Sequence, residues 1–367
     1  MRIGLYTTHA VHNVGAMLQA FALATVLKRE GCDVEIINVL TKELDSKNHH
    51  RGKTSLCRRI LRELYIFAHP GIRGMEQNFE DFHKKLPLTK RYYSNKEYIE
   101  LPNQYDIHLV GSDQVWNTQK GYKHSELCYL NYLPKEAVKK SYASSFGTTD
   151  IVKDEENIKE ALLSFTSLSV REDKAVEFVK GLTGEKCVQN LDPTFLLTSE
   201  EWDQYVEEEP IVKEKYIFYY GVNEDKPTWN ILCEAKRRLN AKLVGYPGPL
   251  PPKYHFDKYI YNGGPLQFIN LIRNAEMVIT SSFHGLAFAI NYHKKFMLVK
   301  YGERMERMES LLRLLNANEF FACTQEDVIR IIDLNNPSRL ARIQEKLNVE
   351  RKKSMGWIID NIISPLF

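Results

Sequence analysis

One histidine stands in a setting suited to moving a proton. His284 follows the apolar run Met277–Ile279 and the polar residues Thr280–Ser282, and the small apolar stretch Gly285–Ile290 comes after it. This order predicts a strand, a turn and a helix, which places His284 beyond the carboxyl end of a parallel strand, where open α/β sheets bind ligands. Because the helix dipole disfavours an imidazolium there, we expect a neutral ring that accepts a proton. The alternative is a histidine that caps its own helix.

Two further predicted strands are followed by side chains that could bind a substrate. Asp113 comes soon after Tyr105–Val110, where it could orient a base or hold a sugar hydroxyl. Trp116 offers a flat apolar face for a pyranose ring, or a large side chain for the core. Arg171 stands at a later strand-to-helix corner, where a guanidinium can bind a carboxylate or phosphate with two hydrogen bonds. Its alternative role is an ion pair with Glu172 or a neighbouring acid.

The chain begins with a third candidate turn. A strand at Arg2–Thr8 and an amphipathic helix at about Ala16–Arg29 predict a βαβ unit that is completed by Asp33–Val39. Asn13 and Gly15 lie in the turn between the strand and the helix, where backbone N–H groups could face an anion. The alternative is a simple tight turn, since one glycine is far short of a phosphate-binding motif.

The elements that carry these residues alternate between strands and helices over most of the chain. With 367 residues and 43% hydrophobic content, we expect two wound, Rossmann-like α/β domains with a cleft between them. The predicted domains are residues 1–200, on the acceptor side, and 201–345, which carries the histidine turn. Residues 346–367 are expected to form a helix that packs back on the first domain.

A basic segment interrupts the first domain at residues 41–101. Between Lys47 and Arg73 there are seven lysines and arginines and a single acid, Glu63. A short helix formed by this basic segment could lie on an anionic membrane surface. The alternative is a solvated lid over the site.

The composition excludes several classes of protein. A net charge of +3, from 50 lysines and arginines against 47 acids, does not favour a nucleic-acid binder. The six cysteines form no CxxC pair and the histidines are not clustered, which indicates a reducing compartment and no metal site. No apolar run reaches the ~18 residues of a membrane span. We therefore expect a cytoplasmic protein, at most peripheral to the inner face of the cell membrane.

Seven segments together resemble the polysaccharide pyruvyl transferase family over about Arg2–Leu315. In chain order they are HNVGAMLQAFAL, LVGSDQVWN, SYASSFG, SVREDKA, LDPTFLL, NAEMVITSSFHGLAFAI and RMESLLRLL. The resemblance implies a fold similar to the two-domain GT-B architecture. It also implies transfer of a pyruvyl group from phosphoenolpyruvate to a sugar, as a ketal, in the synthesis of cell-surface polysaccharide. No cofactor is implied, and the acceptor would be a lipid-linked saccharide.

The resemblance also assigns residues. His284 matches the family histidine implicated in the reaction, and Arg171 matches an arginine implicated in donor binding. Asp113 is a second candidate base by its place after a strand, not by the resemblance. Ser282 departs from the pattern, because some members have an arginine there. The donor side then comprises Arg171, Ser282, Arg304, Arg307, Asn13 and Gly15, in which Arg304 or Arg307 replaces the missing arginine. Trp116 and Asp113 form the acceptor side.

Three other functions fit the same sequence. An enzyme of the same family could act on a different acceptor or donor. A GT-B glycosyltransferase would bind a sugar nucleotide with its second domain, and a non-catalytic relative would bind carbohydrate without needing His284.

Overall fold

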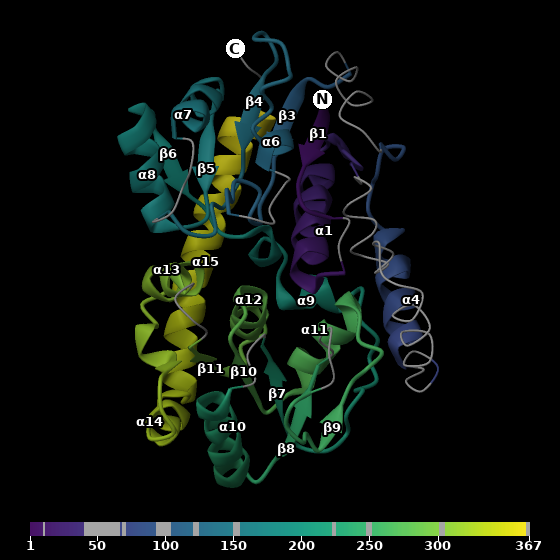
Figure 1. The fold of residues 1–367 in the computed structure, drawn as a ribbon, viewed down its shortest axis with the longest axis vertical. Helices are drawn as coiled ribbons and strands as arrows, with labels where there is room; N and C mark the ends of the chain where they lie inside the picture. The colour runs from purple at the N-terminus through teal and green to yellow at the C-terminus, as the bar shows by residue number, and fades with distance from the viewer. Residues whose placement is uncertain are drawn as a thin grey trace, which may run out of the picture. The chain divides into compact units, whose positions relative to one another are not determined.

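The computed structural model describes most of the chain. The described residues are 1–9, 12–39, 67, 71–92, 104–119, 125–149, 155–221, 225–246, 252–300 and 305–364. The chain divides into two compact units (Figure 1). Unit 1 comprises Met1–Ser55, His83–Leu197 and Glu350–Phe367, and unit 2 comprises Leu56–Phe82 and Thr198–Val349.

Unit 1 is built on parallel strands. These are β1 (Arg2–Tyr6), β2 (Asp33–Ile36), β3 (Ile107–Val110), β4 (Lys139–Ser141), β5 (Leu168–Val170) and β6 (Cys187–Gln189). The first four pair in the order β2-β1-β3-β4, and single bridges from Lys140 to Ser167 and from Ser144 to Val170 join the β5-β6 pair to them. The strand order reverses between β1 and β3, so the carboxyl ends of these two strands form a topological switch point.

Helices connect most of these strands. They are α1 (Val14–Arg29), α6 (Ser125–Cys128), α7 (Glu155–Leu163) and α8 (Asp173–Thr183). Asn13 caps α1, because its side chain accepts the N–H of Ala16 at 3.1 Å, and Gly31 follows the helix with a φ of 82°, which an L-residue rarely adopts. Thirteen residues of α1 are buried, so the helix is held by packing on nearly every side. Figure 1 shows α7 and α8 beside β5 and β6.

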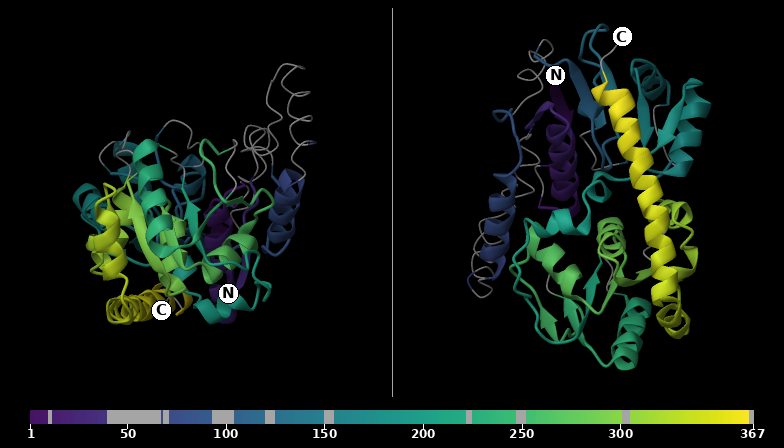
Figure 2. Two further views of the ribbon diagram at one scale, coloured as in Figure 1. Left: turned by 90° about the horizontal axis from the view of Figure 1, so that it is seen from below. Right: turned by 180° about the vertical axis from the view of Figure 1, so that it is seen from behind.

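The end of the chain returns to unit 1. Helix α15 (Pro337–Ile358) begins in unit 2 and ends in unit 1, where the π-helical segment η3 (Ile359–Ile363) continues it. Ser354 Oγ accepts the N–H of Leu191 at 3.0 Å, and the Lys140 ammonium donates to the Asn361 carbonyl. The last turns of α15 thus lie beside the strands of unit 1 (Figure 2).

Unit 2 carries a second parallel sheet. Its strands are β7 (Tyr216–Tyr220), β8 (Lys242–Gly245), β9 (Lys258–Tyr259), β10 (Met277–Thr280), β11 (Lys295–Val299) and β12 (Phe321–Ala322). Their order is β12-β11-β10-β7-β8-β9, so the chain proceeds outward in opposite directions from β7 and β10. The helices are α9 (Ser199–Asp203), α10 (Lys226–Leu239), α11 (Pro265–Asn274), α12 (Phe283–Asn291), α13 (Glu306–Leu314) and α14 (Asp327–Leu334).

One helix from the basic segment lies in the unit opposite to the expected one. Helix α4 (Gly71–His83) falls within residues 41–101, which the sequence places in the first domain, but it packs on unit 2 up to Phe82. Asn78 Nδ2 donates to the Asn262 carbonyl at 2.7 Å, and a Cβ on Gly71 would lie 2.6 Å from Cβ of Tyr261. The expected membrane-binding stretch before α4 lies outside the described residues, apart from Phe67 and Gly71–Arg73. No helix in the described ranges is long and apolar enough to cross a bilayer.

Candidate functional site

The β10 turn, residues Thr280–His284, lies at the topological switch point of unit 2. All four residues of β10 are buried, and its neighbours in the sheet are β7 and β11. Because the strand order reverses between β7 and β10, the carboxyl ends of these strands border the crevice in which open α/β sheets bind ligands. The turn therefore occupies the ligand-binding edge of this sheet.

The hydroxyl of Thr280 fixes the shape of the turn. It donates to the Tyr220 carbonyl at the end of β7, and it accepts the backbone N–H of Ser282 at 3.0 Å. The N–H of Ser281 also reaches the Tyr220 carbonyl, at 3.3 Å. One buried threonine thus ties the start of α12 to the neighbouring strand.

Glycine lets α12 approach β10 closely. A Cβ on Gly285 would lie 2.2 Å from Oγ1 of Thr280 and 3.2 Å from the Tyr220 ring. Heavy atoms essentially never approach this closely, so any larger side chain would push the helix away from the strand. The glycine that follows His284 therefore sets the position of the histidine.

His284 is the second residue of α12 and is only 7% exposed. Its ring meets Phe283 edge to face, with centroids 5.2 Å apart and an interplanar angle of 87°. Ser282 is the N-cap residue, and no side-chain hydrogen bond caps this helix. His284 is thus not the cap of its own helix, and the capping alternative is wrong. A buried imidazole in the first helical turn fits a neutral proton acceptor.

Of the three donor residues predicted in unit 2, the structure describes Ser282 and Arg307. Ser282 is partly exposed, and its hydroxyl does not cap α12. Arg307 lies in the first turn of α13, and α13 packs against α12. Arg304 lies outside the described residues.

The β3 edge of unit 1, residues Gly111–Asn117, carries Asp113 in an unusual conformation. Asp113 has a φ of 74°, and its carbonyl accepts the N–H groups of Val115 and Ser145 at 2.8 and 3.0 Å. A left-handed aspartate costs backbone energy and persists only when its surroundings hold it. Asp113 is partly exposed, so its carboxylate is available to a ligand at this edge.

Arg171 lies behind this edge in a buried network of charges. Its Nη1 donates to Asp192 Oδ2 at 2.6 Å, and its Nε donates to Glu172 Oε1 at 3.1 Å. Ser112 and Ser145 donate to the same two carboxylate oxygens. Burial opposes the charge of Arg171, but the carboxylates of Glu172, Asp192 and Asp113 outweigh it and raise the pKa of the guanidinium.

These contacts are the ion pair that the sequence left as the alternative for Arg171. Its side chain is 3% exposed, so the described contacts are those of an internal link between the ends of β3, β5 and β6. The network brings Arg171 and Asp113 together. Donor binding by Arg171 stays a prediction.

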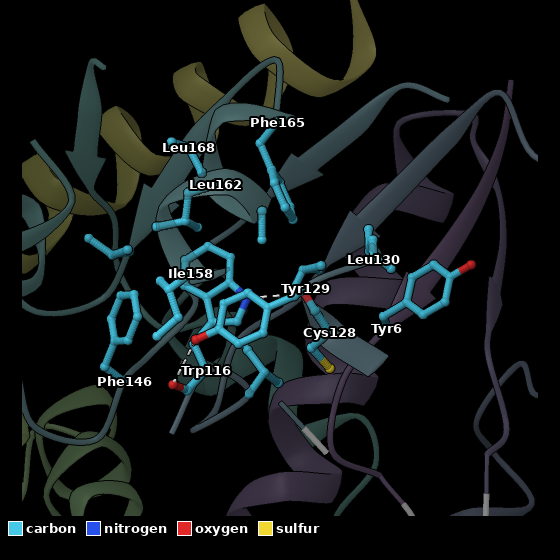
Figure 3. Close-up of a cluster of buried hydrophobic side chains, with 14 of the residues drawn as sticks. Tyr6, Trp116, Cys128, Tyr129, Leu130, Phe146, Ile158, Leu162, Phe165 and Leu168 are labelled. Carbon is cyan, nitrogen blue, oxygen red and sulfur yellow. Dashed lines mark hydrogen bonds between the residues drawn. The ribbon is translucent and has the colours of Figure 1, made fainter. Parts of the chain in front are cut away.

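Trp116 is a core residue, which corrects the expectation of a sugar platform. Its exposed fraction is 0%, and its Nε1 donates to the Cys128 carbonyl at 3.1 Å. The Tyr129 ring stacks on the indole with an interplanar angle of 3°, and Phe146 and Phe165 close two other sides (Figure 3). A pyranose cannot reach an indole that is enclosed in this way.

Asn13 and Gly15 lie at the N-terminus of α1, beyond the carboxyl end of β1. The side-chain oxygen of Asn13 is used by the cap of α1, which carries no acid in its first turn. Gly15 is buried within that turn. The positive end of the helix is thus not neutralised by its own side chains, and anion binding by this turn stays a prediction.

Sequence reasoning missed several residues that build these edges. Asp192 anchors Arg171, and the only signal for it was its place in the LDPTF segment after β6. The backbone carbonyl of Tyr220 accepts the hydrogen bond of the Thr280 hydroxyl. Burial raises the pKa of the Tyr220 phenol to about 12, and the phenol is neutral. Neither partner can be identified from spacing, because each contact joins residues far apart in the chain. The described residues contain no group of three potential metal ligands.

The solved structures that resemble this chain share its fold. A putative UDP-N-acetylglucosamine 2-epimerase from Listeria monocytogenes superposes with a TM-score of 0.60 at 11% identity, over 99% of this chain and 97% of that one. UDP-N-acetylglucosamine 2-epimerase from Neisseria meningitidis, bound to UDP-N-acetylglucosamine, gives 0.55 at 10% identity over 100% of both chains. These likenesses confirm the predicted fold class, two wound α/β domains of the GT-B type.

The sequence comparisons bear on the family. Among curated proteins, none matched the chain. The family model for polysaccharide pyruvyl transferase matches residues 13–303, a span that includes Asp113, Arg171 and the whole β10 turn. Since this match covers most of the sequence, the chain belongs to the polysaccharide pyruvyl transferase family.

Proposed function

We propose that this chain transfers a pyruvyl group from phosphoenolpyruvate to two hydroxyls of a sugar, as a ketal, with His284 moving a proton. The observation that carries this proposal is the β10 turn. It holds an imidazole in the first turn of α12, at the switch point of the sheet, through Thr280 and Gly285. The family supports a transferase of polysaccharide synthesis, and the donor and the ketal product are the proposed parts.

The chemistry requires one proton to be given and two to be taken. Protonation of the methylene carbon of phosphoenolpyruvate leaves an oxocarbenium-like centre at C2, which one sugar hydroxyl attacks. Departure of phosphate and attack by the second hydroxyl complete the ketal, so phosphoenolpyruvate and a diol give the ketal and inorganic phosphate. A neutral His284 can accept a hydroxyl proton, which contributes ~10²–10⁴-fold in general base catalysis. Asp113 is the second candidate base.

The donor carries a carboxylate and a phosphate, and fixed cations must hold both. Arg307 lies in the same unit as His284, on a helix that contacts α12. The N–H groups of the first turn of α12 supply further positive charge to a bound anion. In this scheme Ser282 offers a hydroxyl where some relatives have an arginine, and no metal or cofactor takes part. The acceptor would be a lipid-linked saccharide met at the cytoplasmic face of the membrane.

The test is the release of phosphate from phosphoenolpyruvate in the presence of a panel of candidate sugar acceptors. His284→Asn keeps a polar side chain of similar reach but cannot shuttle a proton near neutral pH. We expect it to lose at least ~10²-fold in turnover while keeping its melting temperature. The matched control is His293→Asn. His293 is exposed and has a φ of 54°, a conformation that asparagine tolerates well, so turnover should be unchanged.

The same assay separates the other functions. Sugar transfer from a sugar nucleotide, without consumption of phosphoenolpyruvate, would identify a glycosyltransferase. Sugar binding without turnover, and equal in wild type and His284→Asn, would identify a carbohydrate-binding protein. Near-normal turnover in His284→Asn would remove His284 from the reaction.

A further inference from the structure

Polar side chains gather on the turn that follows β3, and we call three of them the amide set: Gln114, Asn117 and Gln119. Asn117 is 2% exposed, whereas Gln114 and Gln119 are partly exposed. All three lie beyond the carboxyl end of β3, at the switch point of unit 1. The turn thus brings hydrogen-bonding amides to the edge at which an open α/β sheet binds ligands.

Hydrophobic packing holds this turn in place. Trp116 lies between the amides in the sequence, and Phe146, from the segment after β4, packs on its indole with ring centroids 5.3 Å apart (Figure 3). Gly147 follows Phe146 with a φ of 78°. A Cβ on Gly147 would lie 2.5 Å from both Gln114 Oε1 and Asn117 Nδ2. The contact between the two aromatic rings therefore brings the backbone of the next residue against the amide pair.

A backbone group fixes which way the amides point. The N–H of Gln119 can only donate, and it donates to Asn117 Oδ1 at 2.9 Å. Asn117 Nδ2 must then face the other way, and it donates to Gln114 Oε1 at 2.8 Å. Because Oε1 of Gln114 is used in this bond, its Nε2 is the atom that points away from Asn117.

The amide set leaves one donor and one acceptor for a ligand. In the part of the chain that the structure describes, Gln114 Nε2 meets no acceptor, and the buried Gln119 Oε1 meets no donor. A buried acceptor without a donor costs free energy, which a hydroxyl that donates to it would offset. A hydroxyl both donates and accepts, so it is the ligand group that complements these two amides.

The charges at this edge favour an uncharged ligand. The Arg171 guanidinium is already paired with the carboxylates of Asp192 and Glu172. Asp113, whose carbonyl accepts the N–H of Ser145, adds a third carboxylate to the same edge. Because carboxylates outnumber cations among these groups, a ligand rich in hydroxyls fits the edge better than a phosphate or a carboxylate does.

We propose that Gln114 and Gln119 bind hydroxyl groups of the sugar acceptor, and that Asn117 is the positioning residue that orients Gln114. This assignment rests on the proposed function, which requires a sugar diol as acceptor. Trp116 then serves the acceptor through its packing on Phe146, which holds the turn, and not as a stacking platform.

The experiment measures sugar binding in the absence of phosphoenolpyruvate. The full chain is titrated with methyl glycosides of glucose, galactose and N-acetylmannosamine, and affinity is measured by saturation-transfer difference NMR. Gln114→Glu keeps the size of the side chain and the oxygen that accepts from Asn117, but it replaces the N–H₂ donor by an oxygen. We expect it to weaken the binding of a glycoside at least ~10-fold. Gln114→Met, which removes the donor without adding charge, repeats the test.

Gln104→Glu is the matched control. Gln104 is exposed and precedes β3, at the opposite end of the strand, so the same change of charge should alter the affinity less than ~2-fold. Melting temperatures of the variants separate a loss of binding from a loss of folding. Equal affinities in Gln114→Glu and Gln104→Glu would overturn the proposal, as would the absence of glycoside binding in the wild type.

Deoxy sugars test the orientation of the amides. Removing the contacted hydroxyl from the glycoside should weaken its binding to the wild type but not to Gln114→Glu. Asn117→Asp leaves an oxygen for the N–H of Gln119 but presents a second oxygen to Gln114, whose amide must then turn over. It should therefore lose the same preference for the hydroxyl, which a merely structural role would not change. Gln119→Met should lose the preference for a different hydroxyl, and unchanged preferences in both variants would contradict the assignment.

The outcome is distinguishable from that of the phosphate-release assay. Binding is measured without turnover, so failure of the reaction would leave a sugar site at this edge intact, and His284→Asn should bind the glycosides as the wild type does. Loss of phosphoenolpyruvate binding in Gln114→Glu, with glycoside binding retained, would assign the edge to the donor and overturn the proposal.

Discussion

The β3 edge of unit 1 and the β10 turn of unit 2 follow the same sequence pattern and have opposite chemistry. Each is a buried strand followed by small polar residues and a residue that could act on a substrate. Behind the β3 edge, the buried Arg171 guanidinium is paired with the carboxylates of Asp192 and Glu172. In the β10 turn, the only ionisable side chain is His284, and its position is set by a threonine hydroxyl and a glycine.

The difference shows two ways of building a rigid sheet edge. A network of paired charges links three strand ends of unit 1 and holds Asp113 at its positive φ. The side chains of this network form their hydrogen bonds with one another. In the β10 turn, close packing of a helix on a strand fixes the position of His284. The β10 turn therefore keeps a group with acid–base chemistry at the edge, while most of the β3 edge is structural.

The largest expected effect breaks the network of unit 1. Arg171→Met leaves the carboxylates of Asp192 and Glu172 buried without their cation, which should lower the free energy of unfolding by about 3–5 kcal/mol. Urea unfolding measures this change. The control is Arg238→Met, which removes an exposed ion pair with Glu234 and should leave the midpoint nearly unchanged.

Arg171→Lys separates stability from donor binding. It keeps the charge but loses the planar fork, so it should be more stable than Arg171→Met. If Arg171 also binds the donor, the lysine variant should bind phosphoenolpyruvate more weakly than the wild type does. Wild-type stability in Arg171→Met would show that the network does not hold the β3 edge together.

The next effect tests the packing of the β10 turn. Gly285→Ala places a Cβ against Oγ1 of Thr280, and such overpacking should cost about 1–3 kcal/mol of stability. A shift of His284 by 1 Å should also reduce turnover on the order of 10²-fold. Gly181→Ala in α8 is the matched control, because an added Cβ there meets nothing within 4 Å. If both alanine variants behave alike, the close approach of α12 to β10 does not position the histidine.

The smallest effect concerns His83, a half-buried histidine whose ring stacks on that of His9. The pKa of His83 is about 4 in the folded chain and about 6.5 in an unfolded one. The folded state therefore binds fewer protons between these values, so stability is complete above pH 6.5 and falls as the pH drops toward 4. His83→Gln should flatten the fall of the melting temperature across this window.

The control for this effect is His255→Gln, which removes an exposed histidine and should leave the wild-type curve unchanged. Parallel curves for wild type and His83→Gln would mean that burial and the neighbouring basic groups do not lower the pKa of His83.

The sequence by itself determined the order of most elements. The predicted strand Met277–Ile279 lies within β10, and the predicted strand Arg2–Thr8 contains β1. Their apolar runs are bounded by turn residues, and such local signals do not depend on the rest of the fold. The strand–turn–helix order also placed His284 at a sheet edge, because the direction of a parallel strand follows from the chain alone.

One strand is shorter than its residue pattern predicts, because side-chain hydroxyls take the place of backbone hydrogen bonds between strands there. The run Lys140–Phe146 reads as a strand, but β4 ends at Ser141, and Ala143 has a φ of 48°. The Ser169 hydroxyl accepts the N–H of Ala143, and the Ser144 hydroxyl donates to the Gly111 carbonyl. Hydroxyls that satisfy backbone groups from neighbouring strands make a bend as stable as a longer strand, and the residue pattern does not show it.

Only the tertiary structure decided which candidate side chains face a ligand. Trp116 and Arg171 have the residue types of binding sites, yet one is enclosed by aromatic rings and the other is held by Asp192, 21 positions away. The rings of His9 and His83 likewise stack on each other although the two residues lie far apart in the chain. Burial and ion pairing depend on contacts between distant residues, whereas periodicity and capping are local. The sequence therefore predicted where the sheet edges lie, but not which side chains at those edges are open to a ligand.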